Sequence, residues 1–192
     1  MSQIIQDRIQ KSIEVKQQIL NDTTLLERIN TLVNTICDTF SRGGKVLFCG
    51  NGGSAADAQH LAAEFSGRFY KDRKPLPSEA LHCNTSYLSA VANDYGFEHV
   101  YSRLLEGWAQ KGDMLVALST SGNSTNVLNA VAKAKEMGVF SVAFTGHSGG
   151  NLAQMADMLI NVPSSDTPRI QEAHILIGHI ACELVEQNLF GS

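Results

Sequence analysis

The strongest constraint on the fold is a series of five short apolar runs that alternate with segments of helical periodicity. The runs cover residues 46–49, 80–83, 115–118, 139–144 and 158–162. Strands that alternate with helices along a chain are typical of βα units, in which the strands lie parallel in one sheet. The sequence therefore predicts an α/β fold in three layers, with a doubly wound, mostly parallel sheet of five strands.

Long helices are predicted outside this pattern as well as within it. Two precede the first strand, over residues 2–20 and 24–42, and another follows the last strand, over residues 168–190. Thr24 and Glu27 have the spacing of a capping box for the second helix. The two N-terminal helices are expected to form a hairpin that covers the sheet or packs against a second subunit. The helices between the strands are expected at 54–68, 86–92, 97–109, 124–137 and 149–156.

Length and composition fit one domain. The chain has 192 residues, of which 43% are hydrophobic, and this is enough for a single core. We expect one domain over residues 1–192, made of a helical hairpin at 1–42, a sheet core at 45–163 and the C-terminal helix.

Charge and hydropathy exclude two classes of partner. The 15 basic and 19 acidic side chains give a net charge of −4, so nucleic-acid binding is not expected. No apolar run approaches the roughly 20 residues that span a bilayer, and the N-terminus lacks the pattern of a signal peptide.

The widely spaced cysteines are expected to be buried, reduced thiols of a soluble, cytoplasmic protein. They are Cys37, Cys49, Cys83 and Cys182.

Two loops that follow predicted strands have the composition of an anion site. Ligands of an open parallel sheet bind beyond the carboxyl ends of the strands. Gly50–Ser54 (GNGGS) and Ser119–Ser124 (STSGNS) occupy such places, and each leads into a helix whose N-terminus favours phosphate. Neither is a P-loop or a dinucleotide fingerprint, so a smaller phosphate compound is expected. The alternative is that these are ordinary turn and N-cap residues.

Polar side chains on otherwise apolar helices form a second candidate site. His60 and Glu64 lie one turn apart on the helix after the first loop. Two interpretations stay open. In one, His60 and Glu64 hydrogen-bond each other and His174 or His179 is a core histidine; in the other, the polar groups converge as a metal site or an acid–base pair. The C-terminal helix adds Gln171, Glu172, His174 and His179.

Four separated motifs, in this order, resemble the phosphoheptose isomerase family, whose members are single sugar-isomerase (SIS) domains. The motifs are residues 50–60 with Glu64, Ala92–Gly96, Ser119–Ser124, and Arg169–Glu172 with His179. Taken alone, residues 93–96 are typical of a turn. The resemblance covers nearly the whole chain, and it implies the SIS fold with the strand order of flavodoxins.

The resemblance also implies an activity and an assembly. Members of the family are cytoplasmic homotetramers that convert D-sedoheptulose 7-phosphate to D-glycero-D-manno-heptopyranose 7-phosphate, the first step toward the heptose of the lipopolysaccharide core. This reaction moves a proton between neighbouring carbons through an enediol. It needs a base, an acid and stabilisation of oxyanion charge.

Positions that match the family's motifs imply the role of each residue. Glu64 and His179 would be the acid–base pair, and zinc would bind to His60, Glu64, Gln171 and His179. The phosphate loop would be Ser119, Thr120, Ser121 and Ser124. Further substrate contacts match Asn51, Gly52, Gly53, Ser54, Glu64, Asn93, Asp94 and Gln171. Thr167 and Pro168 depart from members that have an acidic residue before the matching Arg169.

Two rival functions use the same kind of domain. Some relatives are non-enzymatic tetramers that bind the chromosome-replication initiator, and the C-terminal Asn188–Phe190 is similar to theirs. Those relatives lack the carboxylate of Glu64 and have an altered Gly-rich loop, whereas both are intact here. A regulator that senses phosphosugars would need a DNA-binding segment, which this sequence does not show. We therefore expect an isomerase with one zinc ion per subunit.

Overall fold

The computed structural model describes residues 1–191, and its centre is one parallel sheet. The strands are β1 (Val46–Gly50), β2 (Ser78–Ala80), β3 (Met114–Leu118), β4 (Phe140–Thr145) and β5 (Met158–Asn161). They lie in the order β2-β1-β3-β4-β5, and every neighbouring pair is parallel. The doubly wound sheet of five parallel strands and its flavodoxin-like order are thus confirmed.

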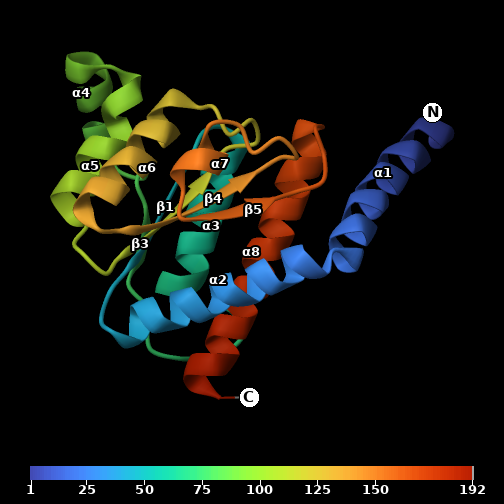
Figure 1. Ribbon diagram of the computed structural model, residues 1–192, viewed down its shortest axis with the longest axis horizontal. Helices are drawn as coiled ribbons and strands as arrows, with labels where there is room; N and C mark the ends of the chain where they lie inside the picture. Colours follow the sequence, from blue (N-terminus) through green and yellow to red (C-terminus); the bar gives the residue numbers. More distant parts are fainter. Residues whose placement is uncertain (192) are drawn as a thin grey trace.

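Helices cover both faces of the sheet (Figure 1). Successive side chains of a strand point to opposite faces, so β1 sends Phe48 into one core and Leu47 into the other. The two cores make the predicted three layers. The Phe48 face carries α2 (Thr23–Ser41), α3 (Gly53–Ser66) and α8 (Thr167–Phe190). The Leu47 face carries α4 (Thr85–Tyr95), α5 (Val100–Trp108), α6 (Thr125–Met137) and α7 (Leu152–Met155).

Three element boundaries differ from the prediction for local reasons. β2 ends at Ala80 because the chain then turns, and the Cys83 N–H donates to the Ala80 carbonyl. The segment Phe97–His99 is one 3₁₀ turn that precedes α5. α7 is shorter than expected because Gly149 and Gly150 have φ values of 71° and 54°, which a right-handed helix does not allow.

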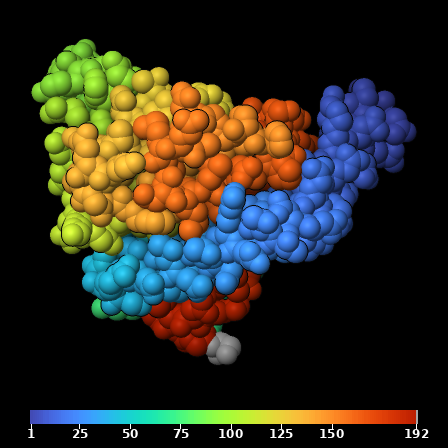
Figure 2. Space-filling view, in the orientation of Figure 1, coloured from blue at the N-terminus to red at the C-terminus, as the bar shows by residue number. Residues whose placement is uncertain are grey.

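The N-terminal helices do not form the predicted hairpin. α1 (Ser2–Asn21) meets α2 at Asp22 and runs away from the sheet instead of folding back along α2 (Figure 1). The predicted capping box is also wrong, because α2 begins at Thr23 and its N-cap is Asp22, whose Oδ1 accepts the Leu25 N–H at 3.0 Å. Figure 2 shows α1 as an arm beside the body of the molecule. Several apolar side chains of α1 are more than half exposed, among them Ile4, Ile5, Ile9 and Ile13.

The cysteines are free thiols, and two of them are buried as predicted. Cys49 and Cys182 lie in the core, and Cys37 is half-buried. Cys83 is exposed, contrary to expectation, because it lies in the turn after β2. Within residues 1–191, no helix combines the length and the apolar character that crossing a bilayer requires.

Candidate active site

The loop after β1 turns the chain sharply into α3. Gly52 caps the helix with φ = 57°, and the Ser54 N–H donates to the Asn51 carbonyl. A Cβ at Gly50 would lie 2.6 Å from the Ser54 carbonyl oxygen, so only glycine fits there. Gly52 and Gly53 are exposed at the helix N-terminus, as a ligand contact requires. Ser54 is only 3% exposed, so its predicted contact with a ligand is not supported.

The side chain of the half-buried Asn51 is held by two hydrogen bonds to Asn126. Its Nδ2 donates to Asn126 Oδ1 at 2.8 Å, and Asn126 Nδ2 donates back to Asn51 Oδ1 at 2.9 Å. The buried Tyr101 hydroxyl donates to the Gly50 carbonyl and lies 3.3 Å from Asn51 Oδ1. This network ties the loop after β1 to the first turn of α6. Asn126 and Tyr101 were not predicted, because one amide on a helix and one core tyrosine carry no sequence signal.

The loop after β3 presents hydroxyls at the start of α6. Ser124 Oγ lies 3.1 Å from Ser119 Oγ instead of capping the helix. Ser121 Oγ accepts the Asn123 N–H at 3.2 Å. Ser119 is only 3% exposed, whereas Thr120 and Ser124 are half-buried and Ser121 is exposed. The hydroxyls of Thr120, Ser121 and Ser124, together with the N-terminus of α6, are therefore the groups that can contact an anion.

Two hollows border this loop. One of about 350 Å³ extends from Thr120 and Ser121 to the segments that follow β4 and β5, where it is lined by His147, Ser164 and Ser165. The other, of about 490 Å³, lies between Asn51, Ser124 and residues 97–98. Volumes in this range are typical of small-molecule sites. His147, Ser164 and Ser165 were not among the predicted site residues, because they lie in loops without a recognisable motif.

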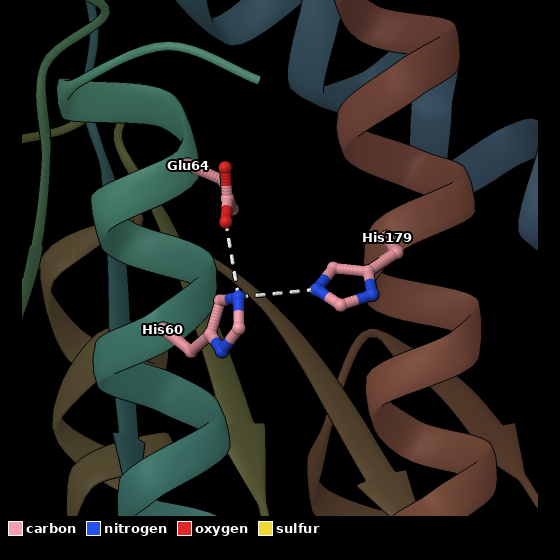
Figure 3. Close-up of side chains that lie close together, drawn as sticks. All are labelled: His60, Glu64 and His179. Carbon is pink, nitrogen blue, oxygen red and sulfur yellow. Dashed lines mark hydrogen bonds and ion pairs between the residues drawn. The ribbon is translucent and has the colours of Figure 1, made fainter. Parts of the chain in front are cut away.

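His60 and Glu64 of α3 meet His179 of α8 (Figure 3). Glu64 Oε1 lies 3.0 Å from His60 Nε2, and His179 Nε2 lies 3.3 Å from the same nitrogen. Burial and the neighbouring His60 lower the pKa of His179, while Glu64 acts in the opposite direction. The structure thus brings together the predicted acid–base pair and three of the four predicted zinc ligands.

Close packing of α3 against α8 makes this meeting possible. A Cβ at Gly178 would lie 2.5 Å from both Cδ atoms of Leu61, so the missing side chain lets the helices approach. His60 directly precedes Leu61, and His179 directly follows Gly178, so both histidines lie at this close approach. The ring of Phe69, from the loop after α3, packs 5.7 Å from the ring of His179.

The three side chains fit a divalent metal ion. His60 Nε2 carries either one hydrogen or one lone pair, so it cannot bond to Glu64 and His179 at once. Tetrahedral zinc with nitrogen ligands at about 2.0–2.1 Å places those ligands about 3.3 Å apart. This agrees with the 3.3 Å between the two imidazole nitrogens. Two imidazoles and a carboxylate are also a donor set that zinc accepts.

Gln171, the fourth predicted zinc ligand, lies apart from this cluster. A Cβ at Gly53 would lie 2.6 Å from Gln171 Nε2, so the amide packs at the start of α3. Gly53 precedes His60 by about two helical turns, or roughly 10 Å of rise. The position of Gln171 suits its predicted contact with substrate, since Gly52 and Gly53 are exposed there.

His174 is a core histidine, as one of the two interpretations held. It is fully buried, its Nε2 donates to the Thr145 carbonyl at 3.1 Å, and its ring packs against Phe144. Burial lowers its pKa to about 4. It therefore stays neutral near pH 7 and takes no part in the cluster around His179.

The free energy of unfolding is expected to depend on pH through His174. Its folded-state pKa of about 4 lies below the ordinary 6.5, so the unfolded chain binds this proton first. Stability is fully present above pH 6.5 and falls toward pH 4, by about 2 kcal/mol between pH 7.5 and pH 5. Urea unfolding of the wild type and His174→Gln at both pH values measures this loss. An equal pH dependence in the two proteins would contradict the assignment.

Asn93 and Asp94 lie on the opposite face of the sheet from α3 and α8. They occupy the last turn of α4 rather than a turn between helices, and Asn93 Nδ2 donates to Asp94 Oδ1 at 2.8 Å. Both side chains are exposed. Within one chain, therefore, the predicted substrate contacts Asn93 and Asp94 do not lie near Glu64.

Comparison with known proteins decides the family. The SIS domain family matches residues 10–146. A phosphoheptose isomerase of Aneurinibacillus thermoaerophilus is 50% identical over 190 residues, covering 99% of this chain and 96% of its own. One of Mycobacterium tuberculosis is 55% identical over 180 residues, covering 94% and 92%. The chain belongs to the phosphoheptose isomerase family of SIS-domain proteins.

A solved phosphoheptose isomerase has the same fold over nearly its whole length. The structure from Neisseria gonorrhoeae superposes with a TM-score of 0.91 at 41% identity, covering 97% of this chain and 98% of that one. Membership of the phosphoheptose isomerase family makes this chain an isomerase. The alternative of a protein that binds the replication initiator is not favoured.

The network around Asn51 has a measurable consequence for this member of the phosphoheptose isomerase family. Asn126→Ala is expected to destabilise the protein by about 1–3 kcal/mol and to weaken sugar-phosphate binding, because the Asn51 amide loses its partner. Urea unfolding and KM report the two effects. Asn129→Ala, one turn later in α6, removes only a bond to the Glu98 carbonyl at the surface and serves as control. Equal effects of the two substitutions would argue against a link between the loops.

Proposed function

We propose that this isomerase converts D-sedoheptulose 7-phosphate to D-glycero-D-manno-heptopyranose 7-phosphate, a step of heptose biosynthesis. The meeting of Glu64 and His179 across α3 and α8 carries the proposal, in a chain half identical to phosphoheptose isomerases. The loop after β3 binds the phosphate through Thr120, Ser121 and Ser124. Gly52, Gly53 and Gln171 contact the sugar.

Proton transfer is divided between two side chains. The Glu64 carboxylate takes a proton from carbon 1 of the ketose, and the electron pair of that bond forms the enediol double bond. The proton then returns to carbon 2, while a proton passes from oxygen 1 to oxygen 2. His179 gives and takes the protons at oxygen through Nδ1, because its Nε2 faces His60 and is the atom that would hold zinc. Glu64 Oε1 faces His60, which leaves Oε2 for the proton.

We also propose that each subunit holds one zinc ion through His60, Glu64 and His179. When bound, zinc polarises substrate oxygens and stabilises the charge of an enediolate. Gln171 was the fourth ligand expected by resemblance, but its place beside Gly53 supports a substrate contact instead.

Zinc removal and resupply test both proposals. Chelator-treated protein is expected to bind one zinc ion per chain, measured by competition with a metal indicator, and to regain conversion of sedoheptulose 7-phosphate. His60→Gln and His179→Gln are expected to lose zinc binding, whereas His99→Gln, on an exposed 3₁₀ turn, retains it. Failure to convert the heptulose with or without zinc would overturn the substrate. Zinc binding that survives both substitutions would overturn the metal site.

We propose that the active form is a cytoplasmic homotetramer in which α1 packs against another subunit. The exposed isoleucines of α1 support this assembly, and the free thiols support the location. Gly53 and Glu64 are separated by about 16 Å of helix rise along α3, so the assembly is expected to combine loops and cluster from different subunits. Sedimentation of the wild type and of Ile9→Asp tests the role of α1, since a charge on this face should dissociate the assembly.

A further inference from the structure

Arg73 binds the backbone carbonyls at the end of α3, including that of Glu64 but not its carboxylate. Arg73 Nη2 donates to the Glu64 carbonyl and Nη1 to the Phe65 carbonyl, both at 2.7 Å. Nη1 also reaches the Gly67 carbonyl at 3.2 Å. The last carbonyls of a helix have no partner within the helix, so Arg73 caps α3 at the turn that carries Glu64.

Arg73 is in turn held by Glu186 of α8. Arg73 Nε lies 3.0 Å from Glu186 Oε2, and the two side chains are 3% and 2% exposed. The Glu186 carboxylate also accepts the N–H groups of Phe69, Tyr70 and Lys71, at 3.2, 2.9 and 2.7 Å. All four donors belong to the loop after α3. This carboxylate therefore fastens that loop to α8 about two turns beyond His179.

Phe69 belongs to this loop and lies beside the cluster of His60, Glu64 and His179. The centre of its ring is 5.7 Å from the centre of the His179 ring. A buried ion pair adds little net stability compared with apolar residues of the same size, whereas its charged hydrogen bonds are directional. The bonds of Arg73 and Glu186 fix the end of α3, the loop and α8 relative to one another. These are the segments that carry or border Glu64 and His179.

We propose that Arg73 and Glu186 are positioning residues for Glu64 and His179. The pair sets the distance between the end of α3 and α8, and so the geometry of the reacting side chains. Its effect on turnover rests on the proposed function, but its effect on the geometry of the cluster does not.

The chain offers a matched control in Asp113. This carboxylate is 1% exposed, accepts the N–H groups of Lys45 and Gln110, and pairs with Lys45 Nζ at 2.6 Å. It lies at the amino ends of β1 and β3, opposite the ligand loops. Asp113→Asn and Glu186→Gln each remove one charge from a buried network of the same kind without changing its size.

Ring ¹H–¹³C NMR of the full chain, freed of metal, tests the proposal without substrate. The six histidines give separate signals, and His60→Gln and His179→Gln assign the two of interest. Both signals are expected to shift in Glu186→Gln and in Arg73→Lys, which keeps the charge but loses the fork to two carbonyls. They are expected to stay in place in Asp113→Asn. With substrate, kcat of the first two variants should fall about 10- to 100-fold with KM little changed.

Unchanged His60 and His179 signals in both Glu186→Gln and Arg73→Lys would overturn the positioning role. So would shifts of equal size in Asp113→Asn, because the effect would then be general destabilisation. If Glu186→Gln does not fold, Arg73→Lys decides alone. Shifted signals in a protein whose wild type does not convert the heptulose would contradict the proposed function and leave the positioning role supported.

Discussion

Glu64→Gln is expected to lower kcat by about 100- to 10,000-fold, the usual contribution of a general base. Glutamine has the size of glutamate and can still accept a hydrogen bond, but it cannot take a proton from carbon. The side chain is 22% exposed and lies beside His60, so the neutral amide should be tolerated by the fold. The measurement is the rate of aldose formation, together with exchange of the carbon 1 proton with solvent.

The controls separate proton transfer from assembly and from metal binding. Glu106→Gln makes the same chemical change on α5, at a side chain that is 61% exposed, and should leave kcat unchanged. Sedimentation should show the same oligomer in wild type and Glu64→Gln. Because Glu64 is also a proposed zinc ligand, zinc content is measured in parallel at saturating zinc. Turnover near the wild-type rate in zinc-loaded Glu64→Gln would remove Glu64 as the base.

Gly122→Ala is expected to lower the free energy of unfolding by about 3 kcal/mol or more, and to abolish measurable binding of the sugar phosphate. Gly122 has φ = 67°, which costs a residue with a Cβ about 1–2 kcal/mol. A Cβ there would also overlap the carbonyl group of Gly149, a backbone group that cannot rotate away. The loop that carries Thr120 and Ser121 would have to move, and overpacking of this kind adds about 1–3 kcal/mol.

Gly43→Ala separates these two causes. Gly43 has a similar φ of 79°, but a Cβ there would have no atom within 4 Å, so only the backbone cost of about 1–2 kcal/mol remains. Urea unfolding measures both variants, and equilibrium dialysis with sedoheptulose 7-phosphate measures binding. A Gly122→Ala protein as stable as Gly43→Ala, with normal binding, would show that the loop after β3 does not depend on its contact with Gly149.

Local sequence pattern was sufficient for the sheet and for the position of the ligand loops. Five apolar runs between helices predict parallel strands, because a crossover connection joins parallel neighbours. The Gly-rich and Ser-rich loops then fall at the carboxyl ends of β1 and β3. Helix spacing placed His60 beside Glu64, whereas the resemblance to the isomerase family was needed to bring in His179.

Interactions between distant segments were decided only by the tertiary structure. No local pattern indicates that Asn51 bonds to Asn126, that Gln171 packs on Gly53, or that α1 leaves the sheet at Asp22. The Arg73–Glu186 pair joins residues 113 positions apart in the chain. Periodicity reports which face of an element is apolar, but it does not report which other element covers that face. Packing of α3 against α8, with Gly178 at their closest approach, therefore determines that His60, Glu64 and His179 meet.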